Sequence, residues 1–196
     1  RSEGGVEELG LDARNLHAPI AELVLVLHVE HPARQHGVNA SIRKAYPGDA
    51  QAICDIYNPY VLDTTITFEQ DPVTPPDMAG RIRAVSADYP WLVAEAERSV
   101  VAYAYATRWR SRAAYDNTAE STIYLKSGTT GSGIGYRLYM ALLDELRRRS
   151  VHAVVGCIAL PNPGSVAFHE KCGFRKVAHF PEVGRKFDRW VDVGFW

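Results

Sequence analysis

The chain has 196 residues, 46% of them hydrophobic, and a formal net charge of −1, a composition that suffices for one packed domain. The near-neutral charge, without a basic stripe that carries interleaved aromatic residues, argues against a nucleic-acid partner. The apolar run from Leu23 to Leu27 is too short to span a membrane, and residues 1–18 lack the basic-then-apolar order of a signal peptide. We therefore expect a cytoplasmic protein without a membrane partner.

Three cysteines, Cys54, Cys157 and Cys172, lie in apolar segments and show no paired spacing of the kind that holds a metal ion. Their odd number and their surroundings favour buried, reduced thiols. We expect no metal site.

Residues 1–40 differ from the rest of the chain and are predicted to form an N-terminal extension of unknown role. Within it, residues 21–29 fit a short strand or a short helix equally well. The domain proper is expected to run from residue 41 to residue 196.

The domain is predicted to open with a strand over residues 41–45. Asp49 can cap the next helix, whose apolar positions recur at helical spacing: Ile53, Ile56, Tyr57 and Tyr60. Residues 71–76 are rich in proline and predict a loop, followed by a second helix over about 77–87. Alternating segments at 91–95 and 100–109 then predict a hairpin with a polar turn at 97–99.

The most informative segment is the run from Thr130 to Gly135, which follows a predicted strand over 118–125 and opens a strongly periodic helix that ends in three arginines, Arg147 to Arg149. Glycines let the backbone approach an anion closely, and the free N–H groups of a helix start favour a pyrophosphate. The run lacks the Lys-Ser or Lys-Thr of a P-loop, and Leu138 stands where a dinucleotide-binding loop has its third glycine. The sequence thus predicts a phosphate loop for another nucleotide-bearing cofactor.

The rest of the chain completes an alternation of strands and helices. Residues 153–160 form an apolar run that predicts a strand buried on both faces. A short helix over 165–172 is expected to end at Gly173, and residues 174–196 supply two last strands. These elements predict an α/β domain with a mixed, mostly antiparallel sheet.

Five blocks of this sequence, at 89–95, 114–124, 160–162, 165–171 and 190–196, closely resemble the phosphinothricin N-acetyltransferases. These enzymes are a branch of the GNAT superfamily of acetyl-CoA-dependent N-acetyltransferases. The resemblance extends from about residue 41 to residue 196, and the first 40 residues match nothing in the family.

This resemblance implies the GNAT acyl-CoA N-acyltransferase fold, in which two central parallel strands splay apart and the cofactor's pantetheine lies in the gap. It implies transfer of acetyl from acetyl-CoA to the amino group of phosphinothricin or of a related small amino acid, such as methionine sulfoximine or methionine sulfone. Transfer would occur by direct attack in a ternary complex. A homodimer is expected as well.

Acetyl transfer from a thioester to an amine needs a neutral amine, a stabilised oxyanion and a proton for the departing thiolate. Glu120 lies in an otherwise apolar or hydroxyl-bearing strand, where partial burial would raise its pKa. The resemblance implies that Glu120 is the base rather than a surface carboxylate. It also makes His169 a candidate for proton transfer and Tyr139 a candidate acid, although the residues alone favour a packed or solvent-facing histidine and a core tyrosine.

The backbone of Ile123, Tyr124 and Leu125 resembles the family's contact with the pantetheine and the thioester, because an added ligand can pair with strand amides as another strand would. The same amides could form the oxyanion site. Asn162 and Ser165 are further candidate cofactor contacts, although Asn162 also suits a turn next to proline. The candidates for the pyrophosphate are Thr130, Gly131, Ser132, Gly133, Ile134 and Gly135.

Phosphinothricin is a zwitterion with an additional phosphinate, so its pocket needs cations and hydrogen-bond donors. Arg110, Arg112 and Tyr115 correspond to the family's substrate-facing segment, and Phe68 would form a wall of the pocket. The competing interpretation is that the arginines alternate along a solvated strand end.

One position departs from the family pattern. GNAT proteins usually begin the phosphate loop with Gln or Arg, where this chain has Thr130, and Lys126 is a candidate replacement from another direction. This difference motivates a second hypothesis, a catalytically weak CoA-binding or sensing module. A third is an acetyltransferase for another small amine, such as a polyamine, although the scattered acidic residues form no evident groove for a polycation.

Overall fold

A computed structural model describes residues 40–196, so that residues 1–39, which make up nearly all of the predicted extension and include its 21–29 segment, lie outside the described residues. The helices and strands follow in the order β1 (Ser41–Lys44), α1 (Ala50–Asp63), α2 (Pro75–Asp88), β2 (Trp91–Ala96), β3 (Ser99–Arg108), β4 (Thr118–Leu125), α3 (Ile134–Arg148), β5 (Ala153–Leu160), α4 (Pro163–Lys171), β6 (Ala178–Lys186) and β7 (Arg189–Phe195). Short 3-10 turns lie at Pro47–Asp49 and Ala113–Tyr115.

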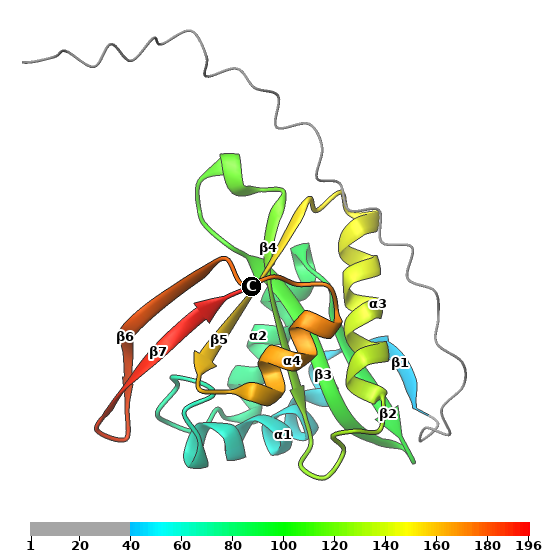
Figure 1. Cartoon of the computed structure of the whole chain (residues 1–196). Helices are drawn as coiled ribbons and strands as arrows, with labels where there is room; N and C mark the ends of the chain where they lie inside the picture. Colours follow the sequence, from blue (N-terminus) through cyan, green and yellow to red (C-terminus); the bar gives the residue numbers. More distant parts are fainter. Residues whose placement is uncertain (1–39) are drawn as a thin grey trace, which may run out of the picture. The chain divides into compact units, whose positions relative to one another are not determined.

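Seven strands of the described chain form one sheet in the order β1-β2-β3-β4-β5-β7-β6. Neighbouring strands are antiparallel except for β4 and β5, which are parallel. The prediction of a mixed, mostly antiparallel sheet is confirmed. In Figure 1 the hairpin of β6 and β7 extends beyond β5 at one edge of the sheet.

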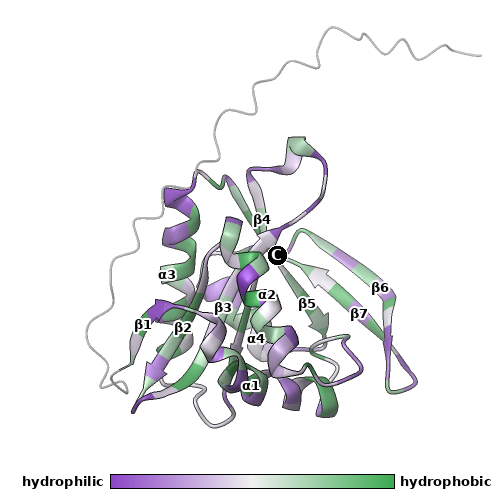
Figure 2. Ribbon diagram, turned by 180° about the vertical axis from the view of Figure 1, so that it is seen from behind, coloured by the Kyte–Doolittle hydropathy of each residue, from purple (hydrophilic) through white to green (hydrophobic). Residues whose placement is uncertain are grey.

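Helices cover both faces of the sheet (Figure 1). On one face Ala102, Ala104 and Ala106 of β3 pack against α3 through residues such as Leu138, and the small alanines let the helix approach the strands closely. On the other face Tyr103, which points the opposite way in the same strand, packs under α1 and α2. Figure 2 views the sheet from the side of α1 and α2.

Some local predictions need correction. Asp49 stands at the start of α1 but makes no cap hydrogen bond, because its carboxylate accepts two hydrogen bonds of 2.8 Å from Arg43 and one from the N–H of Tyr46. Helix α2 begins at Pro75, two residues earlier than expected, since the hydroxyl of Thr74 accepts the N–H of Asp77 and caps it.

Strand β5 is also less buried than predicted. Cys54 and Cys172 are buried as expected, but Cys157 on β5 is exposed, and most other residues of the strand are only half-buried. The reason is that β5 separates from β4 midway along its length and lines a cavity there.

Candidate active site

Strands β4 and β5 pair over only half of their lengths. Residues 118–121 of β4 pair with residues 153–156 of β5, after which β5 pairs with β7 on its other side and has no further pairing with β4. A gap therefore opens in the middle of the sheet after Ser121 and Gly156. This is the splayed arrangement of two central parallel strands that the family resemblance implies.

Backbone groups of β4 point into this gap. The N–H of Lys126 donates to the carbonyl of Val101 on β3, so by the alternation of an antiparallel pair the residues at 123 and 125 direct their backbone groups away from β3. The carbonyl of Leu125 accepts a hydrogen bond of 2.6 Å from the hydroxyl of Tyr60. By the same alternation, the backbone N–H groups of Leu125 and Ile123 face the gap. Tyr124 instead pairs with β3, and its side chain lines the cavity.

A cavity of about 260 Å³ occupies the gap. Because successive side chains of a strand point to opposite faces, Glu120 and Thr122 reach it from the face of α1, and Ser121 reaches it from the face of α4. The cavity thus connects the two faces of the sheet. Its lining consists of Ile66, Thr67, Phe68, Glu120, Ser121, Thr122, Ile123, Tyr124, Cys157, Ile158, Ala159, Asn162, Ser165, His169 and Val193.

Glu120 is a half-buried carboxylate in the cavity wall. Burial raises its pKa above the ordinary range. A carboxylate with a raised pKa and access to a cavity can take a proton near neutral pH.

His169 of α4 lines the same cavity from the opposite face of the sheet and is 5% exposed. Its Nδ1 lies 2.8 Å from the carbonyl oxygen of Ser165, which can only accept, so Nδ1 carries the proton and Nε2 the lone pair. A Cβ added to Gly156 would lie 3.0 Å from Nε2, so the ring packs on the backbone where the strands part. Burial lowers the pKa of His169 despite the opposing effect of the Ser165 hydrogen bond, which favours a neutral imidazole.

Tyr139 lies one layer behind the cavity. Its side chain is fully buried, its ring packs against Phe168, His169 and Phe174, and it is absent from the cavity wall. The phenol oxygen is 2.7 Å from the hydroxyl of Ser121, which does line the cavity. Burial raises the pKa of Tyr139. The phenol reaches the cavity only through Ser121.

The glycine loop enters α3 in the form that the sequence predicted. Gly131 and Gly133 have φ values of 81° and 77°, in the left-handed region, and Gly133 occupies the N-cap position without a side-chain cap. No heavy atom lies within 4 Å of a Cβ added to either glycine, so the loop is open on that side. The first N–H groups of a helix have no partner within the helix, and among residues 40–196 only that of Ile134 is met, weakly, by the hydroxyl of Ser132 at 3.4 Å. This geometry suits a pyrophosphate.

Asn162 and Ser165 lie at the junction between the end of β5 and the first turn of α4. The side-chain oxygen of Asn162 caps α4 by accepting the N–H of Ser165 at 3.1 Å. The amide nitrogen of Asn162 is then the group that can donate to a ligand in the cavity. Both residues line the cavity.

The segment between α1 and α2 forms one wall of the cavity, called the acceptor wall below because the amine acceptor of the proposed reaction would lie against it. Phe68 lines the cavity and is 39% exposed. Next to it, the buried hydroxyl of Thr67 lies 2.7 Å from the phenol of Tyr57, which in turn donates to Glu69 at 3.0 Å. Neither Thr67 nor Tyr57 was expected as a site residue from the sequence, because Tyr57 of α1 meets Thr67 only in the folded chain.

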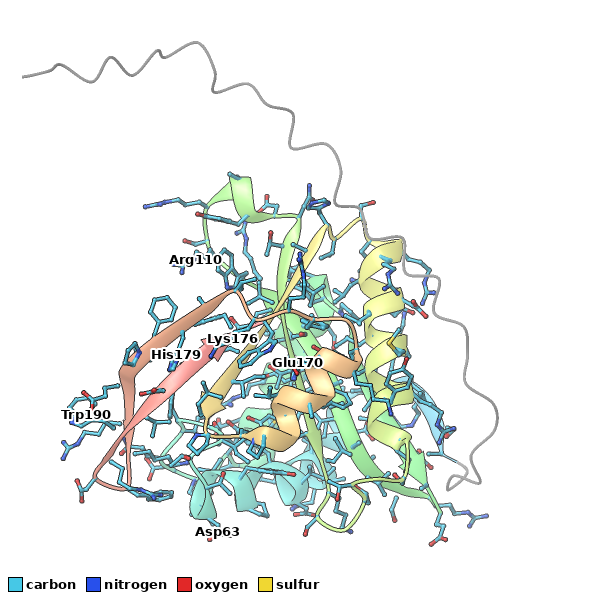
Figure 3. The ribbon with its side chains drawn as sticks, viewed as in Figure 1. Asp63, Arg110, Glu170, Lys176, His179 and Trp190 are labelled. Atoms are coloured by element: carbon cyan, nitrogen blue, oxygen red, sulfur yellow. The ribbon has the colours of Figure 1, made fainter. Side chains whose placement is uncertain are left out.

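The three other predicted substrate residues lie outside the cavity wall. Arg110, Arg112 and Tyr115 belong to the connection between β3 and β4, and Figure 3 shows Arg110 on this connection. Arg110 stacks over the ring of Trp109 and Tyr115 packs edge-on against it. They can meet only a substrate that extends beyond the cavity.

Cys157 and Thr122 are cavity residues that sequence reasoning missed as functional candidates. Although Cys157 is exposed, the loss of hydration at the cavity wall, followed by the negative charge of Glu120, raises its pKa to about 11. The thiol therefore stays protonated beside Glu120. Thr122 could have been found from the sequence, since it stands two residues after Glu120 in a strand and so shares its face.

Residues 40–196 lack two features of other classes of protein. No group of three or more His, Cys, Asp or Glu residues within this range could hold a metal ion. Among the helices of this part of the chain, none is long and apolar enough to cross a membrane.

Comparison with known proteins places the chain among acetyltransferases. The acetyltransferase (GNAT) domain family matches residues 42–194. A phosphinothricin N-acetyltransferase from Streptomyces viridochromogenes is 40% identical over 155 residues, which are 79% of this chain and 85% of that protein. An L-methionine sulfoximine/L-methionine sulfone acetyltransferase from Pseudomonas paraeruginosa is 35% identical over 81% of this chain and 93% of its own length.

The fold has solved counterparts as well. The structure of a GNAT phosphinothricin acetyltransferase from Sinorhizobium meliloti in complex with acetyl-CoA matches with a TM-score of 0.76 and 34% identity, over 80% of this chain and 85% of that one.

Proposed function

Because the chain belongs to the GNAT acetyltransferase family, we propose that it transfers the acetyl group of acetyl-CoA to the amino group of phosphinothricin or of a related small amino acid, such as methionine sulfoximine or methionine sulfone. The observation that carries this proposal is the cavity in the gap between β4 and β5, with a half-buried carboxylate, Glu120, on the acceptor face. The names of the relatives support the substrate class.

The residues present fit acetyl-CoA as the co-substrate. The gap-facing amides of Ile123 and Leu125 suit an extended pantetheine chain, and the open turn at Gly131 and Gly133 suits the pyrophosphate. Bound there, acetyl-CoA supplies a thioester to the cavity. The same two amides, which are fixed in a strand, are oriented to donate to the oxyanion that forms at its carbonyl.

Glu120 is the proposed base. An amino acid arrives mainly as an ammonium ion, which has no lone pair, so a proton must leave before nitrogen can attack the thioester carbon. Glu120 lies on the acceptor face and its raised pKa suits this transfer. His169, neutral and with Nε2 toward the gap, is a second acceptor for the same proton.

The CoA thiolate that leaves the thioester must take up a proton. Tyr139 is the proposed source, acting through the hydroxyl of Ser121, which is the member of the pair that reaches the cavity. The Ser121 hydroxyl donates to sulfur and recovers a proton from the phenol. The phenolate so formed is restored by the proton that the amine released.

Arg110, Arg112 and Tyr115 are proposed to meet the anionic end of the acceptor where it leaves the cavity. Two guanidinium groups suit a phosphinate or a carboxylate. The alternative of a binding or sensing module rests on Thr130, whose exposed side chain replaces the usual Gln or Arg. We place the enzyme in the cytoplasm, where its small soluble substrates are available.

We also propose that the protein is a homodimer. Phe180, Val183 and Trp190 on β6 and β7 are 49–61% exposed, which is unusual for large apolar side chains of one hairpin. Figure 3 shows Trp190 at the outer side of this hairpin. Light scattering of the purified protein tests the dimer, and a monomer at micromolar concentration would contradict it.

An acceptor panel tests the proposed function. Release of free CoA thiol is followed with acetyl-CoA and each of phosphinothricin, methionine sulfoximine, methionine sulfone and spermidine. Turnover with the amino acids and not with spermidine supports the proposal. Tight binding of acetyl-CoA without turnover on any acceptor would favour the sensing module.

A further inference from the structure

The acceptor wall, residues 66–68, belongs to a connection without helix or strand, yet it must hold its shape to select a substrate. Two residues of β6, Gly184 and Lys186, contact it from more than a hundred positions away.

Gly184 receives the ring of Phe68. A Cβ added to Gly184 would lie 2.3 Å from Cζ and 2.5 Å from Cε2 of Phe68, distances at which the ring must move. Gly184 is buried, and its φ is not in the left-handed region. The absence of a side chain therefore serves close packing with Phe68 and not a special backbone conformation.

Lys186 fixes the backbone next to that ring. Its side chain is 4% exposed, and its Nζ donates to the carbonyl of Thr67 at 2.8 Å and to the carbonyl of Val61, in the last turn of α1, at 2.6 Å. A buried ammonium is costly unless it is paired or hydrogen-bonded, and here one carbonyl of α1 and one of the wall accept hydrogen bonds from it. Burial lowers the pKa of Lys186, while the nearby charge of Glu69 acts in the opposite direction.

Strand β6 is itself fixed at this point. Between the pairs Phe180–Val193 and Gly184–Val191 it carries two residues more than β7. The N–H of Glu182 within this bulge donates to the carboxylate of Asp192 at 2.9 Å. Bulges re-aim the side chains that follow them, and Gly184 and Lys186 are the two buried residues that follow.

We infer that Gly184 and Lys186 are positioning residues that determine which acceptors the enzyme accepts, because they hold the Phe68 ring and the Thr67 backbone at the acceptor wall. The inference rests on the proposed function for the meaning of that wall. The two contacts act on one segment from one strand, so loss of either shifts the wall while the acetyl-CoA side, on β4 and α3, stays in place.

The first test is Gly184→Ala, which displaces the Phe68 ring. The displaced ring alters the contacts that bind the acceptor, so the KM for the acceptors should change about tenfold, which corresponds to roughly 1.4 kcal/mol, while the KM for acetyl-CoA stays within about twofold. The change should differ between phosphinothricin and methionine sulfone, which differ in shape. The Phe68→Leu substitution removes the clashing ring. Gly184→Ala should therefore change the acceptor KM less when it is introduced into Phe68→Leu than when it is introduced into the wild type.

The second test is Lys186→Met, which keeps the aliphatic chain and removes the donors. It should change the acceptor KM in the same selective way. Arg185→Met is the matched control, because Arg185 is the neighbouring cation on β6 and is exposed. It should leave both KM values unchanged.

A readout independent of turnover separates this inference from the proposed function. The chain has six phenylalanines, and incorporation of 4-fluorophenylalanine gives one fluorine resonance for each, with that of Phe68 assigned by its loss in Phe68→Leu. Gly184→Ala and Lys186→Met should shift the Phe68 resonance, whether or not any acceptor is acetylated, and Arg185→Met should not.

An unmoved Phe68 resonance, or equal effects of both variants on the two KM values, would overturn the inference. A wild-type protein that acetylates none of the acceptors would instead overturn the proposed function.

Discussion

Glu120→Gln removes the proposed base while keeping the size and shape of the side chain. General-base catalysis contributes about 10²- to 10⁴-fold, which corresponds to roughly 2.7–5.4 kcal/mol of activation free energy at about 1.36 kcal/mol per factor of ten. Because Glu120 is half-buried and burial alone raises its pKa, the carboxylate is a better base than an exposed one. We therefore expect kcat near neutral pH to fall by about 10²- to 10⁴-fold.

The pH profile gives the sharper assay. Wild-type kcat/KM should rise through the raised pKa of Glu120, whereas that of the variant should rise only at the higher pH where the acceptor amine loses its proton unaided. The factor by which the wild-type kcat/KM exceeds that of Glu120→Gln should therefore become smaller at high pH. Glu170→Gln, which changes an exposed carboxylate on α4 beside His169, is the control and should keep the wild-type profile. An unchanged kcat at pH 7 in Glu120→Gln would refute the assignment.

The same substitution has a consequence for stability. The pKa of Glu120 is raised in the folded protein above its ordinary value of 4.5, so between the two values the folded state binds more protons and stability falls as pH rises. At neutral pH the ionised carboxylate thus costs stability that Gln does not. The unfolding midpoint of Glu120→Gln should exceed that of the wild type at pH 7, and the difference should vanish below about pH 4.5. A less stable variant at pH 7 would contradict the burial argument.

Three further predictions follow from the proposed roles. Arg112→Ala should raise the KM for an anionic acceptor far more than the KM for acetyl-CoA, because a guanidinium suits the acceptor, and equal effects in steady-state kinetics would indicate a structural role. Deletion of residues 1–38 should leave activity nearly unchanged, and loss of the folded circular-dichroism spectrum would show that the removed segment packs on the domain. Thr130→Gln adds an exposed donor to the phosphate loop and should tighten acetyl-CoA binding by about two- to fivefold, or roughly 0.4–1 kcal/mol, in calorimetric titration; no tightening would mean that the backbone amides already suffice. An arginine at the adjacent Gly131 is a poor companion, since its φ of 81° costs other residues about 1–2 kcal/mol.

The sequence predicts the elements around the cavity well because their signals are local. The bounds 118–125 and 153–160 follow from runs of strand-forming residues, and the turn at Gly131 and Gly133 follows from the need for φ above zero. Glu120 in this strand fits a surface carboxylate as well as a base, and the family resemblance supplied its role as the base. The resemblance also supplied the candidate roles of His169 and Tyr139.

The rest of the site depends on contacts between distant segments. The pairing of β5 with β4 ends midway and its pairing with β7 begins on the other edge, and Cys157 in this part of β5 is exposed against the expectation of a buried strand. Lys186 and Thr67 are 119 residues apart in the chain. No periodicity or spacing in the sequence reports such a pair.

Acetylation of a small amino acid tests the account most directly. Wild-type protein, acetyl-CoA and phosphinothricin or methionine sulfoximine at millimolar concentration are incubated, and the products are analysed by mass spectrometry together with the release of free CoA thiol. We predict the N-acetylated amino acid and one free thiol for each acetyl group transferred, with the yield strongly reduced in Glu120→Gln. Intact acetyl-CoA binding with no acetylated small α-amino acid would contradict the account.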